Sequence, residues 1–175
     1  MNDIAIQASG LGRRFGEMWA VRGLDLEVRR GEIFGLVGPD GAGKPTTLRL
    51  LTGILAASAG TASVAGFPIG DSDEEIKGRI SYMSQSFGLY GDLSVEENLR
   101  FYADLYEVPR REREPLEERL LGFSNLTPFR KRLARNLSGG MKQKLGLACA
   151  LIHKPEILFL DEPTNGVDPV SRRAF

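Results

Sequence analysis

The stretch Gly38-Pro39-Asp40-Gly41-Ala42-Gly43-Lys44-Pro45-Thr46 decides the fold. Its first seven residues fit the GxxxxGK pattern, in which glycines let successive backbone N–H groups point inward around an anion. The apolar run 33–37 before it predicts a strand buried on both faces, and segment 47–51 after it predicts a helix that ends near Gly53. This order predicts a phosphate-binding loop in which Lys44 neutralises the outer phosphates; an ordinary glycine turn is the alternative.

Two other phosphate-binding patterns do not fit the sequence. A dinucleotide fingerprint would need a glycine where Thr46 stands, and no HRD or DFG triplet of a protein kinase occurs. The GxxxxGK reading is therefore the one that remains.

The composition excludes several classes of protein. Lys plus Arg and Asp plus Glu both total 23 in 175 residues, so the net charge is zero and we expect no nucleic-acid partner. A single cysteine, Cys149, excludes an internal disulfide framework and suits a core position in an apolar helix. We expect no secretory signal at the amino terminus, and no apolar run reaches the roughly 18 residues of a membrane span.

The remaining periodicity predicts an α/β chain with a helical insert. Ser94 and Glu97 form a capping-box pattern at the start of a helix. A charged segment, 109–119, leads into a second helix that ends near Gly122, and a third runs from Met141 to about His153. The other predicted strands are 4–8, 24–28, 62–65, 80–83 and 157–160.

Two acidic residues follow the apolar run 157–160. Neighbouring residues of a strand face opposite ways, so Asp161 and Glu162 can have different roles. Asp161 suits the shell of a magnesium ion, through water, and Glu162 suits orienting or deprotonating an attacking water. The alternative is a charged strand end that faces solvent.

The segment Leu137-Ser138-Gly139-Gly140-Met141 precedes the third helix. Ser138 can be a simple N-cap, but free N–H groups at a helix start also make a second anion site. Because one chain needs only one phosphate loop, we interpret this segment as closing over a nucleotide held by another subunit.

Three segments resemble, in their order and context, the motifs of the nucleotide-binding domain of ATP-binding cassette (ABC) transporters: 38–44, 137–143 and 158–163. The resemblance covers essentially the whole chain. It implies an α/β fold: a P-loop NTPase (RecA-like) core, an antiparallel β subdomain and an inserted α-helical subdomain. We expect one C-terminally truncated domain over 1–175, with a catalytic core lobe of 1–85 and 154–175 and a helical lobe of 86–153.

The resemblance also implies roles for single residues. Phe15 matches the aromatic residue that stacks on adenine, and Gln85 matches the glutamine that senses magnesium and the attacking water. Their alternatives are a core phenylalanine and a solvated loop glutamine. Asp168 matches the dimer-facing loop, or is a plain turn residue. The resemblance assigns nucleotide binding to Phe15, Gly38, Pro39, Asp40, Gly41, Ala42, Gly43, Lys44, Pro45 and Thr46. It assigns magnesium binding to Gln85 and Asp161, and catalysis to Glu162 and Gln85. The signature residues, which act in trans, are Ser138, Gly139 and Gly140.

The implied function is that of an ATP-binding and ATP-hydrolysing motor subunit. Its partners would be ATP with Mg²⁺, a second nucleotide-binding domain and a transmembrane permease, which places it in the cytoplasm, peripheral on the inner face of the membrane. Segments 82–85 and 165–172 resemble exporters of the drug-efflux or ABC-2 type. A cassette ATPase without a transporter and a non-catalytic, degenerate cassette are the two alternatives.

Two features depart from the resembled family. Its loop has serine or threonine after the lysine, where this chain has Pro45, which supplies neither a hydroxyl nor an N–H. Thr46 follows one position later, about 100° further around the helix, so its hydroxyl should point in another direction. We therefore expect weaker binding of magnesium-ATP and still weaker hydrolysis. The chain also stops at Phe175, before the family's further strands and its switch histidine. We therefore expect an unprotected sheet edge.

Overall fold

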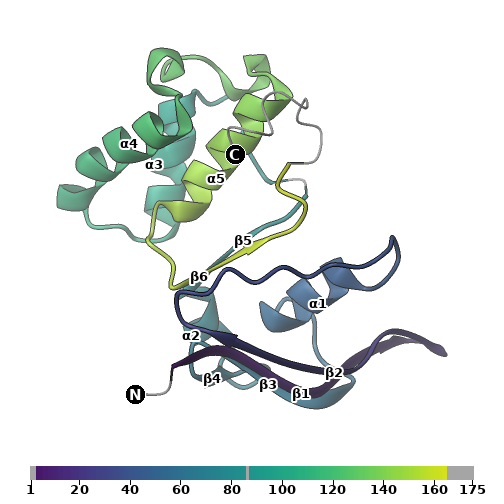
Figure 1. Cartoon of the computed structure of the whole chain (residues 1–175). Helices are drawn as coiled ribbons and strands as arrows, with labels where there is room; N and C mark the ends of the chain where they lie inside the picture. Colours follow the sequence, from purple (N-terminus) through teal and green to yellow (C-terminus); the bar gives the residue numbers. More distant parts are fainter. Residues whose placement is uncertain (1–2, 86, 165–175) are drawn as a thin grey trace. The chain divides into compact units, whose positions relative to one another are not determined.

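The computed structural model describes residues 3–85 and 87–164 (Figure 1). The described residues up to Ile80 form one compact unit and those from Ser81 onward form another. Asp168 lies outside the described residues, so its predicted place in a dimer-facing loop stays a prediction. The predicted lobe boundaries also stay a prediction.

The first unit is built on an antiparallel sheet with the strand order β2-β1-β3-β4. Strands β1 (Ile4–Phe15) and β2 (Met18–Arg29) form a long hairpin, joined by Gly16 and Glu17. Gly16 has φ of 57°, a left-handed conformation that glycine adopts without steric cost. The other strands are β3 (Ala59–Val64) and β4 (Phe67–Pro68). The sequence predicted shorter versions of β1, β2 and β3, whereas β4 was not predicted.

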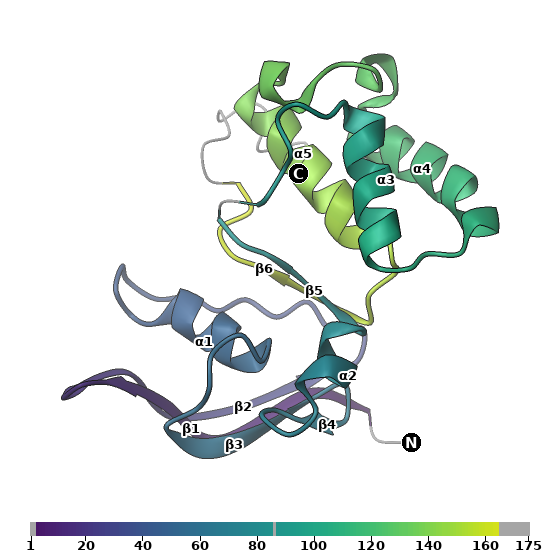
Figure 2. The same cartoon turned by 180° about the vertical axis from the view of Figure 1, so that it is seen from behind.

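Helix α1 (Lys44–Leu51) lies over one face of this sheet in both views and contacts β2 and β3 (Figures 1 and 2). The short helix α2 (Asp73–Lys77), which the sequence did not predict, precedes β5. The core contains the fully buried side chains of Leu11, Leu50, Val64 and Ile76. Burying a side chain of this size contributes about 1.5–3 kcal/mol, so the burial of Leu50 stabilises α1 in this unit.

The predicted buried strand over 33–37 is wrong for this structure. Residues 32–39 form no strand, and Ile33 and Val37 are 101% and 94% exposed. A strand is defined by the neighbour that receives its N–H and C=O groups, and no described strand pairs with this segment. An apolar run indicates that a segment can be buried, but the pairing that makes it a strand has to come from elsewhere in the chain.

The second unit contains three helices that pack against one another: α3 (Val95–Leu105), α4 (Arg110–Ser124) and α5 (Gly139–Leu151). Their shared core includes the fully buried Leu99, Leu121, Leu145 and Ile152. Cys149 is also buried there, as predicted, and burial raises the pKa of its thiol. Two 3₁₀ turns, Thr127–Phe129 and Ala134–Asn136, connect α4 to α5.

Strands β5 (Ile80–Met83) and β6 (Ile157–Leu160) form a two-stranded sheet, and both lie where the sequence predicted them. The backbone N–H of Asp161 donates to the carbonyl of Met83 at 2.9 Å. The last residue of β5 is therefore bonded to the residue after β6, which brings the carboxyl ends of the two strands together.

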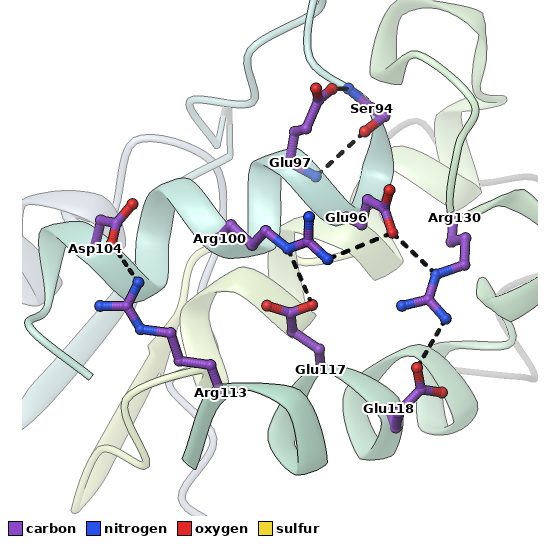
Figure 3. A network of polar contacts seen from close by, with 9 residues as sticks. All are labelled: Ser94, Glu96, Glu97, Arg100, Asp104, Arg113, Glu117, Glu118 and Arg130. Carbon is purple, nitrogen blue, oxygen red and sulfur yellow. Dashed lines mark hydrogen bonds and ion pairs between the residues drawn. The ribbon is translucent and has the colours of Figure 1, made fainter. Parts of the chain in front are cut away.

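Helix α3 begins with the predicted capping box (Figure 3). The Oγ of Ser94 accepts from the N–H of Glu97 at 3.3 Å, and a carboxylate oxygen of Glu97 accepts from the N–H of Ser94 at 2.7 Å. The backbone N–H of Ser94 stabilises the charged form and lowers the pKa of Glu97. A pattern of four residues therefore fixes where this helix starts.

A polar network joins α3, α4 and the segment after them (Figure 3). Arg130 contacts Glu96 at 3.0 Å and Glu118 at 2.8 Å, and Arg100 contacts Glu117 at 3.4 Å. The Glu117 side chain is only 6% exposed. Burial raises its pKa, and the charge of Arg100 partly offsets that rise.

Candidate functional site

The glycine loop 38–43 folds against strand β2. Gly43 has φ of 86°, and a Cβ added there would lie 2.3 Å from the carbonyl oxygen of Ala20. Any residue with a side chain would collide with the β2 backbone, so glycine is required for this close approach. The N–H of Thr47 donates to the carbonyl of Gly43 at 2.8 Å, which makes the loop run directly into α1.

Lys44, the first residue of α1, turns back over the loop. Its Nζ donates to the carbonyl oxygens of Gly38 at 2.8 Å and Pro39 at 2.9 Å. The ammonium charge therefore sits beside the loop and the start of the helix. The N-terminal end of a helix attracts anions, so the charge of Lys44 and the α1 dipole favour the same kind of ligand.

A cavity of about 550 Å³ opens between β2 and the loop. Lys44, Ala42 and Thr47 line it on one side, and residues 20–25 of β2 line it on the other. Ligand pockets in proteins commonly measure about 300–1,000 Å³, so the space matches a small molecule. Two of the predicted phosphate-binding residues, Ala42 and Lys44, thus border a cavity.

Pro45 is accommodated in α1. It is the second residue of α1, within the first turn, where backbone N–H groups have no partner inside the helix. The helix therefore forms without the proline N–H. Thr46 is half-buried and Thr47 is 5% exposed. Position 45, which is a proline, supplies no hydroxyl to the loop.

Phe15 is the last residue of β1 and is 45% exposed. This exposure contradicts the alternative that Phe15 is a core residue. The guanidinium of Arg13 lies over its ring, 4.8 Å from the centroid. The ring is thus an accessible flat surface at the end of the hairpin, as a base-stacking residue requires.

The two acids after β6 lie in different environments. Asp161 is 7% exposed and accepts a hydrogen bond from the hydroxyl of Tyr82 at 3.1 Å. Glu162 is exposed, has φ of 48° and accepts from the Nε2 of Gln85 at 3.3 Å. The structure therefore brings Gln85 to Glu162, as expected for two residues of one catalytic set. Both residues follow strands of the same small sheet.

The oxygen donors near these acids suit Mg²⁺. This ion is typically held by one or two carboxylates, with waters and substrate phosphates completing its shell. Asp161 supplies a carboxylate and Gln85 an amide oxygen, while the described residues contain no cluster of three or more His, Cys, Asp or Glu side chains. The donor set fits an ion that arrives with a phosphate ligand better than an all-protein metal cage.

Ser138 is the N-cap of α5, as predicted. Its Oγ accepts from the N–H of Met141 at 3.3 Å. Ser138 and Gly139 are exposed, and Gly140 is partly exposed. The capping role is thereby confirmed, and the role in trans stays a prediction because it involves a second subunit.

Two neighbours of the site were missed by sequence reasoning. Tyr82 bonds Asp161 across 79 positions of sequence, and Arg13 covers one face of Phe15. The contact of Tyr82 depends on which strands lie side by side, and no local pattern indicates that, whereas Arg13 and Phe15 lie two positions apart on the same strand, β1. A search for polar side chains on strand neighbours of the motif residues would have found Tyr82.

The sequence of residues 21–165 matches that of the ABC transporter family. The chain is 52% identical over 175 residues to the probable multidrug ABC transporter ATP-binding protein YbhF of Escherichia coli, covering 99% of this chain and 30% of the relative. It is 36% identical to the linearmycin resistance ATP-binding protein LnrL of Bacillus subtilis, covering 95% of this chain and 54% of that one. The chain thus spans about a third to a half of the length of these curated relatives.

Solved structures agree with the fold. A structure described as the ATP binding subunit of an ABC transporter superposes with a TM-score of 0.86 at 29% identity, covering 97% of this chain and 71% of that one. The cbiO1 subunit of Clostridium perfringens, part of the transporter complex cbiONQ, gives 0.86 at 26% identity, covering 97% and 70%. The predicted α/β P-loop NTPase fold class is confirmed. Within the described part of the chain, no helix combines the length and apolar character needed to cross a bilayer.

Proposed function

The chain belongs to the ABC transporter family, and from this premise we propose that it is the ATP-binding and ATP-hydrolysing motor subunit of an exporter. The observation that carries the proposal is the phosphate loop, where Gly43 lies against β2 and the ammonium of Lys44 lies beside the start of α1. Relatives named for multidrug transport and for linearmycin and daunorubicin resistance favour export.

The loop residues bind and orient the nucleotide. Backbone N–H groups of 38–46 and the positive end of α1 hold the phosphates, and Lys44 exchanges its bonds to the loop carbonyls for bonds to phosphate oxygens. The exposed ring of Phe15 stacks on adenine. Both contributions are made by residues of the first unit.

Residues after β5 and β6 perform the hydrolysis. Asp161 and Gln85 would hold a Mg²⁺ ion that arrives with ATP, and the ion would supply neutralisation of the phosphate charge. Glu162 orients and deprotonates the attacking water, and its bond to the Nε2 of Gln85 holds the carboxylate in place. The side chain of Asp161 is held in place by the hydrogen bond that it accepts from the hydroxyl of Tyr82.

Two copies close over two nucleotides in this proposal. Ser138, Gly139 and Gly140 of one copy approach the γ-phosphate in the other, and the loop containing Asp168 faces the partner. Closure and reopening would drive a separate transmembrane permease, so the chain would act in the cytoplasm at the inner face of the membrane. Export is favoured by the relatives, but the transported compound is determined by the permease.

The proposal is tested by Glu162→Gln. If Glu162 is the general base, the variant should bind ATP like the unchanged chain but hydrolyse it about 100-fold more slowly. Glu75→Gln, which changes an exposed carboxylate on α2, serves as the matched control. If hydrolysis by the unchanged chain is too slow to quantify, both variants are compared in a Pro45→Thr background. Equal rates for Glu162→Gln and Glu75→Gln would reject the assigned role.

A nucleotide-binding module without hydrolysis is the second candidate, and Pro45 is the observation that favours it. The proline leaves the loop able to bind phosphates through Lys44 but removes a magnesium ligand. This candidate predicts that the unchanged chain binds ATP without measurable turnover and that Pro45→Thr, which restores the hydroxyl, gains hydrolysis.

A further inference from the structure

We propose that Arg13 is a positioning residue that fixes the ring of Phe15 for stacking on the base of a bound nucleotide. The inference deepens the proposed function and rests on it. It assigns the contact between the guanidinium and the ring, 4.8 Å from carbon to centroid, a role in base recognition. This distance is within the roughly 6 Å over which a guanidinium and an aromatic face attract each other.

Arg13 is held by the chain that follows the phosphate loop. Its Nη1 donates to the carbonyl of Ala56 at 2.8 Å, and Ala56 comes shortly after the end of α1. One side chain therefore connects the segment after α1 to the aromatic ring at the end of β1. Because both ends of this link belong to the first unit, the ring is set relative to the helix that starts at the phosphate loop.

The surroundings of the Nε of Arg13 bear on the contact between its guanidinium and the ring of Phe15. It is buried and has no hydrogen-bond partner among the described residues. Buried polar atoms almost always have a partner, so this exception needs an explanation. The electron-rich face of Phe15 attracts the guanidinium as a whole, while its Nη1 alone is bonded to the carbonyl oxygen of Ala56.

The backbone beneath Arg13 is also fixed. The N–H of Arg14 donates to the Oγ of Ser58 at 3.1 Å, and the N–H of Ser58 donates to the carbonyl of Gly12 at 2.8 Å. A Cβ on Gly12 would lie 2.9 Å from the ring of Trp19, so glycine lets the two strands pack closely. Arg13 therefore projects from an anchored strand rather than from a loose hairpin tip.

This geometry leaves one face of Phe15 for a ligand. The guanidinium covers one face of the ring, and the side chain is still 45% exposed. A ring that is already held in place loses less conformational freedom when a base stacks on it, which strengthens binding. This gain in affinity should occur only for a ligand that carries a base, and it should not depend on the phosphates.

The test compares two ligands, ATP and inorganic tripolyphosphate, which lacks a base. Binding is titrated for the unchanged chain, Arg13→Gln, Phe15→Leu and the double variant. Arg13→Gln should weaken ATP binding about 2- to 30-fold and leave tripolyphosphate binding unchanged. In the Phe15→Leu background the same change should alter ATP binding less than about twofold, because no ring remains to be positioned.

Two further variants separate positioning from folding. Arg13→Lys keeps a cation over the ring and should recover part of the ATP binding. Arg14→Gln, which changes an exposed neighbour bonded to Gly16, should leave both ligands unaffected. Thermal unfolding of each variant identifies any that is merely destabilised.

The outcomes distinguish the inference from the proposed function. If Arg13→Gln weakens ATP and tripolyphosphate equally, or acts equally with and without Phe15, the positioning role is wrong and the phosphate site stands. If the unchanged chain binds neither ligand, both the proposed function and this inference are overturned.

Discussion

At the scale of single residues, Gly43 sets the shape of the phosphate loop. Its φ of 86° and the 2.3 Å approach of an added Cβ to the carbonyl of Ala20 leave no room for a side chain. The GxxxxGK spacing predicted that Gly43 belongs to a phosphate-binding loop. The contact with β2 that requires a glycine there is seen only in the folded chain.

Gly43→Ala should therefore lower the free energy of unfolding by more than about 1 kcal/mol and weaken ATP binding, because strain and a backbone collision add together. Denaturant unfolding and an ATP titration measure the two effects. Gly35→Ala is the matched control, since an added Cβ there meets nothing within 4 Å. Equal stability of the two variants would contradict the close approach.

We expect Pro45 to lower the response of the site to magnesium. Pro45→Thr should restore a hydroxyl ligand for the ion. The ratio of ATP affinity with Mg²⁺ to ATP affinity without it should then be about tenfold larger than in the unchanged chain. Pro45→Ala restores only the N–H and separates the two losses. Titrations of ATP with Mg²⁺ and with a chelator give the ratio. A ratio that is the same in all three proteins would show that Pro45 does not affect magnesium.

At the scale of elements, local signals predicted the helices well. The capping residues Ser94 and Ser138 lie where their patterns indicated, because the bonds that cap a helix are made within three residues of the cap. The strand expected over 33–37 failed for the opposite reason, since its ladder needs a distant partner. The short elements α2 and β4 have too few residues to show a period.

Ser94→Ala should lower the free energy of unfolding by about 1 kcal/mol, because it removes the oxygen that accepts from the N–H of Glu97. Ser72→Ala is a suitable control: Ser72 caps α2 but makes no side-chain capping bond. Urea unfolding of both variants gives the difference. A loss as large in Ser72→Ala would mean that the capping box contributes nothing specific.

Glu117 gives α4 a pH-dependent contribution to stability. Burial raises its pKa in the folded chain above the reference value of 4.5, so the folded state holds this proton more tightly than the unfolded state. Its contribution to the unfolding free energy is therefore greatest below about pH 4.5 and falls as the pH rises through the folded pKa. Arg100, Glu96 and Arg130 are the charged groups that act on it.

Glu117→Gln should become more stable relative to the unchanged chain as the pH is raised from 4 to 7, because glutamine carries no charge to bury. Unfolding free energies measured across that range test the slope. Glu97→Gln should show the opposite slope, since the pKa of Glu97 is lowered and its stabilisation is lost as the pH falls below about 4.5. A pH-independent difference for Glu117→Gln would contradict the burial argument.

At the scale of the whole molecule, the motif residues are divided between the two units. Phe15 and the loop 38–46 belong to the first, while Gln85, Ser138, Asp161 and Glu162 belong to the second. The sequence could identify these residues because each lies in a short motif. It did not identify Tyr82, whose partner Asp161 is 79 positions away, or Arg13, whose contact with Phe15 lies within β1 but belongs to none of these motifs. The sequence match over 21–165 supports one family for the two units together.

The most direct test of the account is an ATP titration of the unchanged chain and of Lys44→Met. The account predicts saturable binding of one ATP per chain, weakened about 30-fold or more by Lys44→Met, because a cation that faces phosphate is lost. Lys77→Met, which changes an exposed lysine paired with Glu74, should bind ATP like the unchanged chain. Binding that is absent from the unchanged chain, or equally strong in Lys44→Met, would contradict the assignment of 38–46 as a nucleotide site.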